Sequence, residues 1–454
     1  MAGESKDLDV MLGDARSAIR SMAVPLILSY LVVQINSFMD TSWCSMLGVD
    51  ASSAVSTIAP LYWIVGCIGP ALGVGASTSI ARCLGRGDRD TANSLAVQTV
   101  FAGLVISVVL TPVLYVLIDP LISMMGAGDI RDLCFDYVAP IVICTVPAVM
   151  SGVVSGTLRS EGAAKRSTAM LMTSAVANMV LDPVLIFGLD MGLAGAGWAT
   201  GISSVISLAA GLWWYARGKT YLSISLRGFR FRGDLTRDVL AVGVPRAAEN
   251  TTNSFMSMLH RIFVIACGGT TGAALFSVPW RYISLSQVVS QGIGSALIPV
   301  ASAAMGRNDY AKAREASLYA VKITMGPMIL IAVLLFVFAD YAIIPFTLTG
   351  SMAEMRSEFA HVLRIYAFII PFFALADLGS CILQSLRLAQ MSMVAAIGRN
   401  VLILIFLALT YTISMDAIFY GLLAAEVVGG VAMIWLAKRE FDLRERASGA
   451  EGTP

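Results

Sequence analysis

Long apolar stretches recur along the whole chain of 454 residues, and each is long enough to cross a lipid bilayer. A transmembrane helix needs about 20 mostly apolar residues at a rise of roughly 1.5 Å per residue. Hydrophobic residues make up 57% of the sequence and charged residues only 13%, which excludes an ordinary soluble protein. The sequence therefore predicts an all-α integral membrane protein. We count twelve spans: 17–44, 51–81, 93–118, 130–156, 167–188, 194–216, 237–267, 271–303, 316–340, 357–385, 391–413 and 415–437.

Basic residues concentrate on one side of these predicted spans. If both termini lie on the same side, 23 of the 31 Lys and Arg fall in loops on that side, with Arg159 counted among them. The opposite loops hold little beyond Arg131 and Arg356. The positive-inside rule then places both termini in the cytoplasm. No cleavable signal peptide is expected, because about twenty largely polar residues precede the first span.

The two halves of the chain repeat each other. "SMAVPLILSYLVVQINSFMD" and "AVGVPRAAENTTNSFMSMLH" align Pro25 with Pro245, at an offset of 220 residues. "LGRGDRDTA" matches "MGRNDYAKA" at an offset of 221, and "GTLRSEG" matches "QSLRLAQ" at 228, which pairs Arg159 with Arg387. Because each half has six spans, we expect parallel six-helix repeats facing a central cleft. The predicted domains are a lobe over 1–217, a solvated basic linker over 218–236, a second lobe over 237–440 and a cytoplasmic tail over 441–454.

Two polar pairs stand inside otherwise apolar segments of the first half. Asn36 and Asp40 lie in the first span, and Asn178 and Asp182 lie in "VANMVLDPVLIF" in the fifth. Their four-residue spacing places each pair on one helical face. A carboxylate near the bilayer centre costs about 2.5–3.5 kcal/mol, so two retained acids indicate a function. If they share a cavity, they can take up a proton or hold a sodium ion with the Asn oxygens. Alternatively, Asp182 caps or hydrogen-bonds a neighbouring helix, since Pro183 interrupts the local hydrogen-bond ladder.

The second half carries different polar residues. The seventh span has a polar stripe from Arg246 to His260, so one face of that helix cannot face lipid. Its Glu249 is either neutralised by Arg246 or Arg281, or it serves in substrate binding. His260 is either a satisfied core residue or a group that titrates near neutral pH. The candidate substrate-cleft residues are Glu249, Asn253, Arg281, Asp377 and His260.

These motifs resemble the multidrug and toxic compound extrusion (MATE) family. The resemblance rests on two six-span halves, "P-x14-D" in the first span, the Gly-Arg loops, "LRSEG" after the fourth span and "NMVLDP" in the fifth. The prokaryotic subgroup that includes DNA-damage-inducible protein F is the most similar. One departure is Ser155 or Thr157 where the family often has Asn. The resemblance implies a cation-coupling site at Asp40 and Asp182, with Asn178, Tyr137 and Thr200 as polar partners. The four-residue spacing between Asn36 and Asp40 adds Asn36 to this site.

The resemblance and the residues together predict an antiporter of a prokaryotic plasma membrane. It would export small amphiphilic organic cations in exchange for protons or sodium ions, with no cofactor, and sodium would bind at Asp40, Asp182 and Asn178. We expect a monomer in contact with membrane lipid and no nucleic-acid partner. Arg246, Arg261 and Arg281 would also admit anionic or zwitterionic substrates.

The sequence disfavours two other classes of protein. A flippase for lipid-linked sugars is disfavoured by the twelve spans and the acid pair. An intramembrane enzyme is disfavoured because the chain has no DDxxD, HExxH, GxSxG or Walker-type motif.

Overall fold

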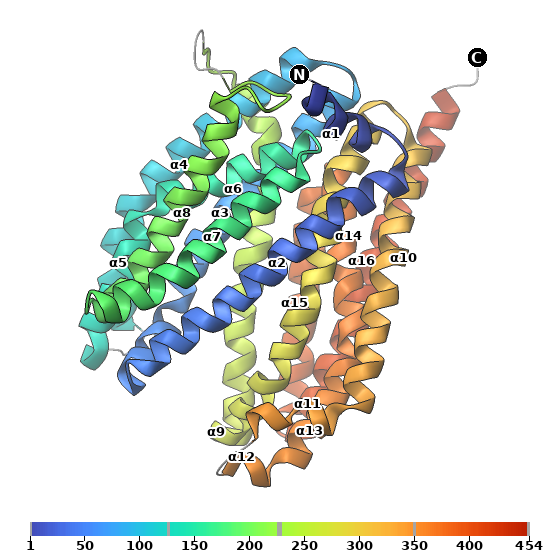
Figure 1. Cartoon of the computed structure of the whole chain (residues 1–454). Coiled ribbons are helices and arrows are strands. Elements are labelled where there is room, and N and C mark those ends of the chain that lie inside the picture. The colour runs from blue at the N-terminus through green and yellow to red at the C-terminus, as the bar shows by residue number, and fades with distance from the viewer. Residues whose placement is uncertain (1, 125–127, 225–228, 348–350, 452–454) are drawn as a thin grey trace.

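The computed structural model describes residues 2–124, 128–224, 229–347 and 351–451, and these are almost wholly helical (Figure 1). The predicted all-α class is confirmed for this part of the chain. Five short helices lie outside the long ones: α1 (Ala2–Leu12), η1 (Gly128–Ile130), α11 (Ala339–Ala342), η3 (Ile344–Phe346) and α12 (Ser351–Glu354). The long elements are α2 (Ala15–Met46), α3 (Val49–Gly85), α4 (Arg89–Met124), α5 (Arg131–Ile143) with α6 (Thr145–Ser160), α7 (Ala164–Pro183) with η2 (Val184–Gly188), α8 (Gly192–Ala216), α9 (Gly233–Gly306), α10 (Tyr310–Val337), α13 (Arg356–Ala367) with α14 (Ile369–Ser385), α15 (Ala389–Thr410) and α16 (Met415–Glu451).

These elements agree with twelve membrane spans. Ten helices of the described residues are long and apolar enough to cross a membrane, or eleven when the bent pair α5–α6 counts as one span. The first half of α9 supplies a twelfth segment, since α9 breaks at Gly269, where φ is 59°. Its polar stripe lowers the hydropathy of that half. Each predicted span has an observed counterpart, although the observed helices extend beyond several predicted ends.

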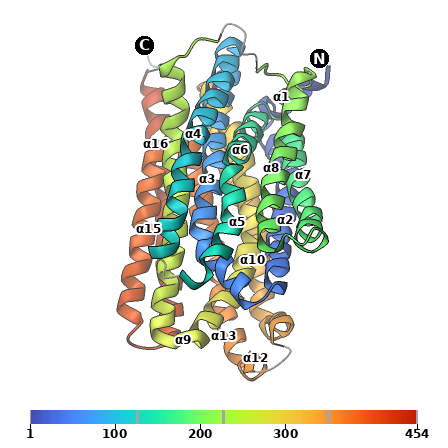
Figure 2. The same cartoon turned by 90° about the vertical axis from the view of Figure 1, so that its left-hand side faces the viewer.

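The first six spans gather on one side of the molecule and the last six on the other (Figure 1). The long helices run in roughly the same direction across the molecule (Figure 2). Both termini lie at the same end of this bundle, which we call the terminal face. The most extensive contact between the two sets of spans is between α3 and α9.

The predicted linker and tail are partly ordered. The linker ends earlier than predicted, because α9 begins at Gly233, and Leu222 within it is only 1% exposed, so it is not simply a solvated loop. The predicted tail is helical through Glu451, since "KREFDLRERA" contains strong helix formers and neither Gly nor Pro. Linker residues 225–228 and tail residues 452–454 lie outside the described residues.

The structure corrects one of the three repeat alignments. α6 ends at Ser160 and α14 at Ser385, which are 225 residues apart. The left-handed residues that follow them, Gly162 (φ 80°) and Arg387 (φ 62°), are also 225 apart. Arg387 therefore corresponds to Gly162, and the predicted pairing of Arg387 with Arg159 at an offset of 228 is wrong. The matching letters "LR" misled the alignment, because the helix ends set the register of the repeat.

The ends of α3 and α9 cross at the terminal face without room for side chains between them. A Cβ atom at Gly85 would overlap the carbonyl oxygen of Ala303, and one at Gly306 would overlap the carbonyl oxygen of Arg82. The two contacts are related by the repeat offset of 221 residues, so each half of the chain supplies one glycine and one carbonyl group to the crossing. Arg307 Nε also donates to the Gly85 carbonyl oxygen at 2.9 Å. Small residues at helix crossings in membranes permit such close approach.

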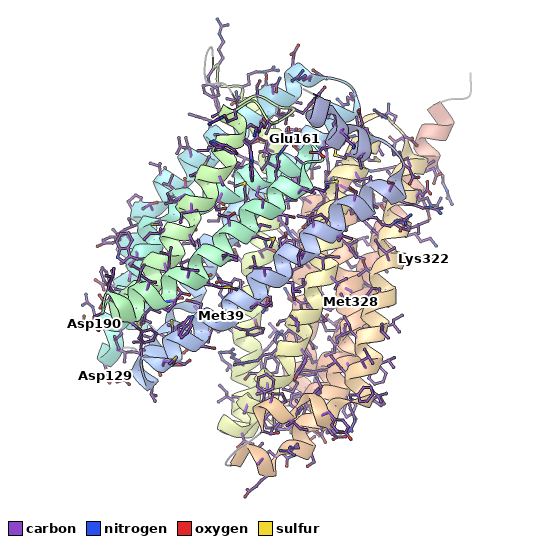
Figure 3. The ribbon with its side chains drawn as sticks, in the orientation of Figure 1. Met39, Asp129, Glu161, Asp190, Lys322 and Met328 are labelled. Carbon is purple, nitrogen blue, oxygen red and sulfur yellow. The ribbon has the colours of Figure 1, made fainter. Side chains whose placement is uncertain are left out.

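The linker is held to the first set of spans by Glu161, which lies near the terminal face (Figure 3). Glu161 is 1% exposed, and its Oε2 accepts a hydrogen bond from the Leu222 N–H at 2.8 Å. Burial raises the pKa of the Glu161 carboxyl from 4.5 to about 8, although the Leu222 N–H and the Arg166 charge favour the ionised form. The guanidinium of Arg89 adds a second tie, since its Nη2 donates to the Tyr221 carbonyl oxygen at 2.7 Å.

This buried carboxyl predicts that stability falls as the pH rises. The folded chain binds more protons than the unfolded chain between the two pKa values, so the contribution is full below pH 4.5 and is lost as the pH rises through about 8. We expect the Tm in detergent to decline between those two pH values, and Glu161→Gln, which keeps an oxygen for Leu222, to flatten the decline. Glu358→Gln, which replaces an exposed acid of α13, should leave the decline in Tm unchanged. Equal decline in all three proteins would contradict the assignment.

The reciprocal glycine crossing predicts a local loss of packing when a side chain is added. Gly85→Val forces α3 away from α9, and overpacking of this kind costs about 1–3 kcal/mol. We expect a Tm lower by several degrees and greater protease sensitivity at the terminal face. Gly326→Val in α10 is the matched control, because a Cβ atom there meets nothing within 4 Å. Equal Tm values for the two variants would show that the crossing is not tightly packed.

Candidate functional site

A hydrogen-bonded chain joins Asn36, Asn178 and Asp182 within the first set of spans. Asn36 Nδ2 donates to Asn178 Oδ1 at 2.7 Å, and Asn178 Nδ2 donates to Asp182 Oδ1 at 3.1 Å. Asn178 is 5% exposed and Asp182 is fully buried. The four-residue spacing on α7 aligns the latter two, and α2 lies alongside to complete the chain. These three predicted residues are brought together.

Asp40 lies one turn beyond Asn36 on α2, within electrostatic range of Asp182. One carboxyl oxygen of each acid, and Asn36 Oδ1, are buried without a hydrogen-bond partner among the described residues. A buried polar atom without a partner costs about 1–3 kcal/mol. Protonation of a carboxyl group, or a hard cation with oxygen ligands, would satisfy these atoms. In the described ranges no three His, Cys, Asp or Glu side chains form a metal site, so such a cation would have two carboxylates and amide oxygens.

Two tyrosines lie near both acids. Tyr137 of α5, one of the predicted polar partners, is 3% exposed and lies within electrostatic range of Asp40 and Asp182. Tyr62 of α3 lies within range of the same two acids, but it was not predicted, because a single Tyr in an apolar span carries no distinctive pattern. Thr200 of α8 is half-buried, and the hydrogen bonds of the described residues do not join its side chain to either acid.

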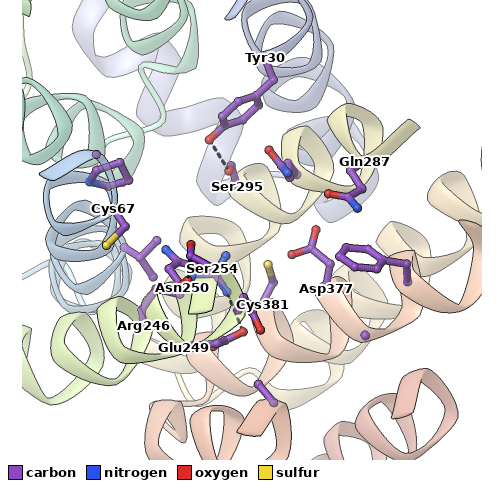
Figure 4. A pocket seen from close by; sticks show the side chains of 18 of the residues that line it. Tyr30, Cys67, Arg246, Glu249, Asn250, Ser254, Gln287, Ser295, Asp377 and Cys381 are labelled. Atoms are coloured by element: carbon purple, nitrogen blue, oxygen red, sulfur yellow. Dashed lines mark hydrogen bonds and ion pairs between the residues drawn. The ribbon is translucent and has the colours of Figure 1, made fainter. Parts of the chain in front are cut away.

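A cavity of about 520 Å³ lies between the two sets of spans (Figure 4). Its walls come from α2, α3 and α6 on one side and from α9, α14, α15 and α16 on the other. Trp63 and Phe373 are among its apolar residues. The charged lining residues are Arg159, Arg246, Glu249, Asp377 and Arg399, and the predicted Asn253 also lines it.

Glu249 is held in a cradle of polar side chains at the cavity wall and is only 4% exposed. Its Oε1 lies 3.0 Å from Arg246 Nη1 and accepts a hydrogen bond from Ser380 Oγ at 2.8 Å. Its Oε2 accepts from Ser392 Oγ at 3.2 Å and from Gln384 Nε2 at 3.4 Å. Of the alternatives that the sequence left open, the structure therefore shows neutralisation of Glu249, by Arg246 and not by Arg281.

Two predicted cleft residues lie elsewhere. Arg281 is exposed, and its guanidinium lies 5.6 Å from the centre of the Phe346 ring, outside the cavity. His260 is 7% exposed and does not line the cavity, and its Nε2 has no hydrogen-bond partner among the described residues. Both belong to α9, with His260 before the break at Gly269 and Arg281 after it.

Sequence reasoning missed a polar cluster on α15 and α16. Arg399 Nη1 lies 3.4 Å from Glu426 Oε2, and both side chains are largely buried. The neighbouring Asn400 Nδ2 donates to Asn253 Oδ1 at 2.7 Å. The available signal was the charge of Arg399 and Glu426 inside apolar spans. Each half thus links its first and fifth spans through an Asn–Asn hydrogen bond of 2.7 Å.

Known proteins share this sequence pattern. A family model described as MatE matches residues 25–184 and 245–410. The multidrug export protein MepA of Staphylococcus aureus is 22% identical over 249 residues, and the match covers 55% of each protein. The chain therefore aligns with about half the length of that relative. The FAD transporter of Shewanella oneidensis is 25% identical over 438 residues, which cover 92% of this chain and 93% of the relative.

Solved structures share the fold over nearly the whole chain. A multidrug resistance MATE transporter in an outward-facing conformation superposes with a TM-score of 0.92 at 26% identity, covering 97% of this chain and 98% of its own. A MOP superfamily transporter of Pyrococcus furiosus, whose binding pocket is described as reversed in polarity, gives a TM-score of 0.93 at 26% identity, with 97% and 99% covered. Since the family model matches one long stretch in each half of the chain, together well over half of its residues, the protein belongs to the MatE family.

Proposed function

We propose that this protein is a secondary active antiporter that exports amphiphilic organic cations in exchange for protons or sodium ions. The single observation that carries the proposal is the pair of acids, Asp40 and Asp182, each with one buried carboxyl oxygen that has no partner among the described residues, apart from the cavity between the lobes. The names of the relatives, a multidrug export protein and an FAD transporter, support organic molecules as substrates. In this proposal the chain works as a monomer in a prokaryotic plasma membrane and belongs to the subgroup of DNA-damage-inducible protein F.

The proposed orientation places the terminal face in the cytoplasm. The concentration of Lys and Arg in the loops at that face supports it. The glycine crossing of α3 and α9 then closes the cleft toward the cytoplasm, and the cavity is reached from outside. Similarity to a transporter solved in an outward-facing conformation supports the same state.

α2 is the proposed link between ion and substrate. It carries Asp40 and Asn36 toward α7, and its Tyr30 lines the cavity. A proton or sodium ion that neutralises the acid pair changes the charge held between α2 and α7. Pro25 frees a backbone group in α2, so this helix can bend there and move Tyr30. Binding energy that differs between two conformations is what shifts a transporter between them. A potential of about 100 mV supplies roughly 2.3 kcal/mol per charge moved inward.

The cavity suits an amphiphilic cation at Asp377. Its Oδ2 is buried without a hydrogen-bond partner among the described residues, and no ion pair in that part of the chain includes it. Trp63 and Phe373 provide apolar and aromatic surface in the same cavity. A cation would therefore find a carboxylate and ring faces together.

A flippase for lipid-linked substrates is the second candidate. The observation that favours it is that three guanidinium groups, those of Arg159, Arg246 and Arg399, line the cavity. Such groups bind the phosphates of a lipid-linked headgroup well. Two of the three already have a carboxylate partner, which weakens this candidate.

Efflux of ethidium from proteoliposomes, driven first by an imposed proton gradient and then by a sodium gradient, tests the antiporter. We expect Asp182→Asn and Asp40→Asn to lower gradient-driven efflux about tenfold or more, since about 1.4 kcal/mol of lost coupling is a factor of ten. Asp190→Asn, at an exposed acid just beyond the same span, should leave efflux within about twofold, because a change under about 0.5 kcal/mol is typical of such sites.

Wild-type efflux in the Asp182→Asn variant under both gradients would refute the coupling site. If folded wild-type protein ignores both gradients but moves a fluorescent lipid-linked phosphate between leaflets, the flippase is correct instead.

A further inference from the structure

The two lobes contain the same pair of serines in the same register. Ser155 and Ser167 lie in the first lobe, and Ser380 and Ser392 lie 225 residues later in the second. The hydroxyl oxygens are 2.7 Å apart in the first pair and 2.8 Å apart in the second. We call each pair a serine frame. The frames connect α6 with α7 and α14 with α15, so they are a structural element of the repeat.

The two frames bind different charged groups. In the second lobe the frame donates to the carboxylate of Glu249, with help from Gln384. The residue that corresponds to Gln384 in the first lobe is Arg159. Its Nη1 donates to Ser155 Oγ at 3.0 Å and to Ser167 Oγ at 3.2 Å. In the second frame Ser380 Oγ also accepts from Arg246 Nη1 at 3.1 Å, so that frame holds a paired carboxylate and guanidinium, whereas the first frame holds a guanidinium alone.

The first lobe has no acid at the position that would neutralise Arg159. By the offset of 220 between Pro25 and Pro245, Glu249 corresponds to Ser29, whose hydroxyl donates to the Leu26 carbonyl oxygen at 2.8 Å. The charge on Arg159 was predicted to lie in a loop. It lies instead in a buried side chain, 6% exposed, that lines the cavity. The other neighbour within electrostatic range is the hydroxyl of Tyr30, also at the cavity.

Unlike Arg159, the other two guanidinium groups at the cavity each have a carboxylate partner. Arg246 lies 3.0 Å from Glu249 and Arg399 lies 3.4 Å from Glu426. Among the ion pairs of the described ranges, none includes Arg159. A buried cation with only hydroxyl partners keeps most of its desolvation cost, so a bound anion would stabilise it. Arginine also suits carboxylates and phosphates, which accept two parallel hydrogen bonds from it.

The opposite wall presents the complementary charge. Asp377 of α14 has the unpartnered buried oxygen described above. The cavity thus offers one unpaired cation from the first lobe and one unpaired anion from the second. A substrate with a single charge would leave one of the two without a partner.

We propose that the natural substrates are zwitterionic amphiphiles, whose carboxylate or phosphate binds Arg159 and whose cationic group binds Asp377. This inference rests on the proposed export of organic cations and narrows their class. The apolar body of the molecule lies against Trp63 and Phe373. Because the two charges belong to different lobes, such a substrate bridges them, and rocking of the lobes breaks one contact at a time.

Two dyes that differ in one group test the proposal. Rhodamine 110 carries a carboxylate and a cationic ring system, and rhodamine 123 is its methyl ester and carries the cation alone. Their binding to purified full-length protein is measured by fluorescence anisotropy, without any ion gradient. We expect rhodamine 110 to bind about tenfold more tightly, as a charge-assisted bidentate contact provides. Asp377→Asn should weaken both dyes alike, because both carry the cation.

Arg159→Gln is the decisive variant. The second lobe shows that Gln fits a serine frame, since Gln384 Nε2 donates to Ser380 Oγ at 2.8 Å. We expect this variant to bind the two dyes equally. Arg159→Lys, which keeps the charge, should retain part of the preference even if the Gln variant folds poorly. Arg131→Gln removes a half-exposed guanidinium of the same lobe and should preserve the full preference.

Other outcomes overturn the proposal. The proposal is wrong if the dye ratio is unchanged in Arg159→Gln, if wild type binds rhodamine 123 equally or more tightly, or if wild type binds neither dye. A failure of the proposed antiport can be distinguished from a failure of the zwitterion site. A normal dye preference in protein that shows no gradient-driven efflux would refute antiport and leave the zwitterion site intact.

Discussion

The cost of placing charge in the hydrocarbon region is the constraint on which the rest of this structure depends. Lipid offers no partner to a carboxylate or a guanidinium, so each charged side chain of a span must turn inward and find one. Arg246 with Glu249 and Arg399 with Glu426 meet this demand at the cavity wall. The outer faces, such as those of α4 and α10, expose Val and Leu instead. The polar side chains of the spans therefore lie inside the lobes or at the cavity, among a core that is mostly apolar.

The two lobes show how one framework can carry different chemistry. Both have an Asn–Asn bridge between the first and fifth spans, and both have a serine frame. In the first lobe the bridge leads to Asp182 and the frame holds a cation without an acid. In the second lobe the frame holds Glu249, which Arg246 neutralises. A repeat therefore preserves backbone geometry and hydrogen-bonding positions, while single substitutions such as Arg159 for Gln384 place a positive charge where the other lobe has a neutral amide.

Some errors of the sequence interpretation share one physical cause. Arg159 was assigned to a loop because a charge near the end of an apolar stretch is normally solvated, yet α6 continues to Ser160 and buries it. Arg281 is predicted to line the cleft because it is a charge inside the apolar eighth span, but it is exposed and lies outside the cavity. Tyr62 was overlooked because its role depends on neighbours from α2 and α7. Burial and direction depend on the packing of other helices, which local pattern does not contain.

The sequence by itself determined the all-α class, the twelve spans, the two repeats and the pairing of Asn178 with Asp182 along one helical face. These follow from hydropathy, chain length and the 3.6-residue period, which are local properties. Only the tertiary structure decided that Asn36 joins Asn178, that Arg246 neutralises Glu249, and that Arg159 and Asp377 line one cavity without ion-pair partners in the described residues. These contacts join residues more than a hundred positions apart or depend on where a side chain points. Apart from the Arg246–Glu249 pair, whose residues lie three positions apart on α9, they arise from how the helices cross, so no single segment encodes them.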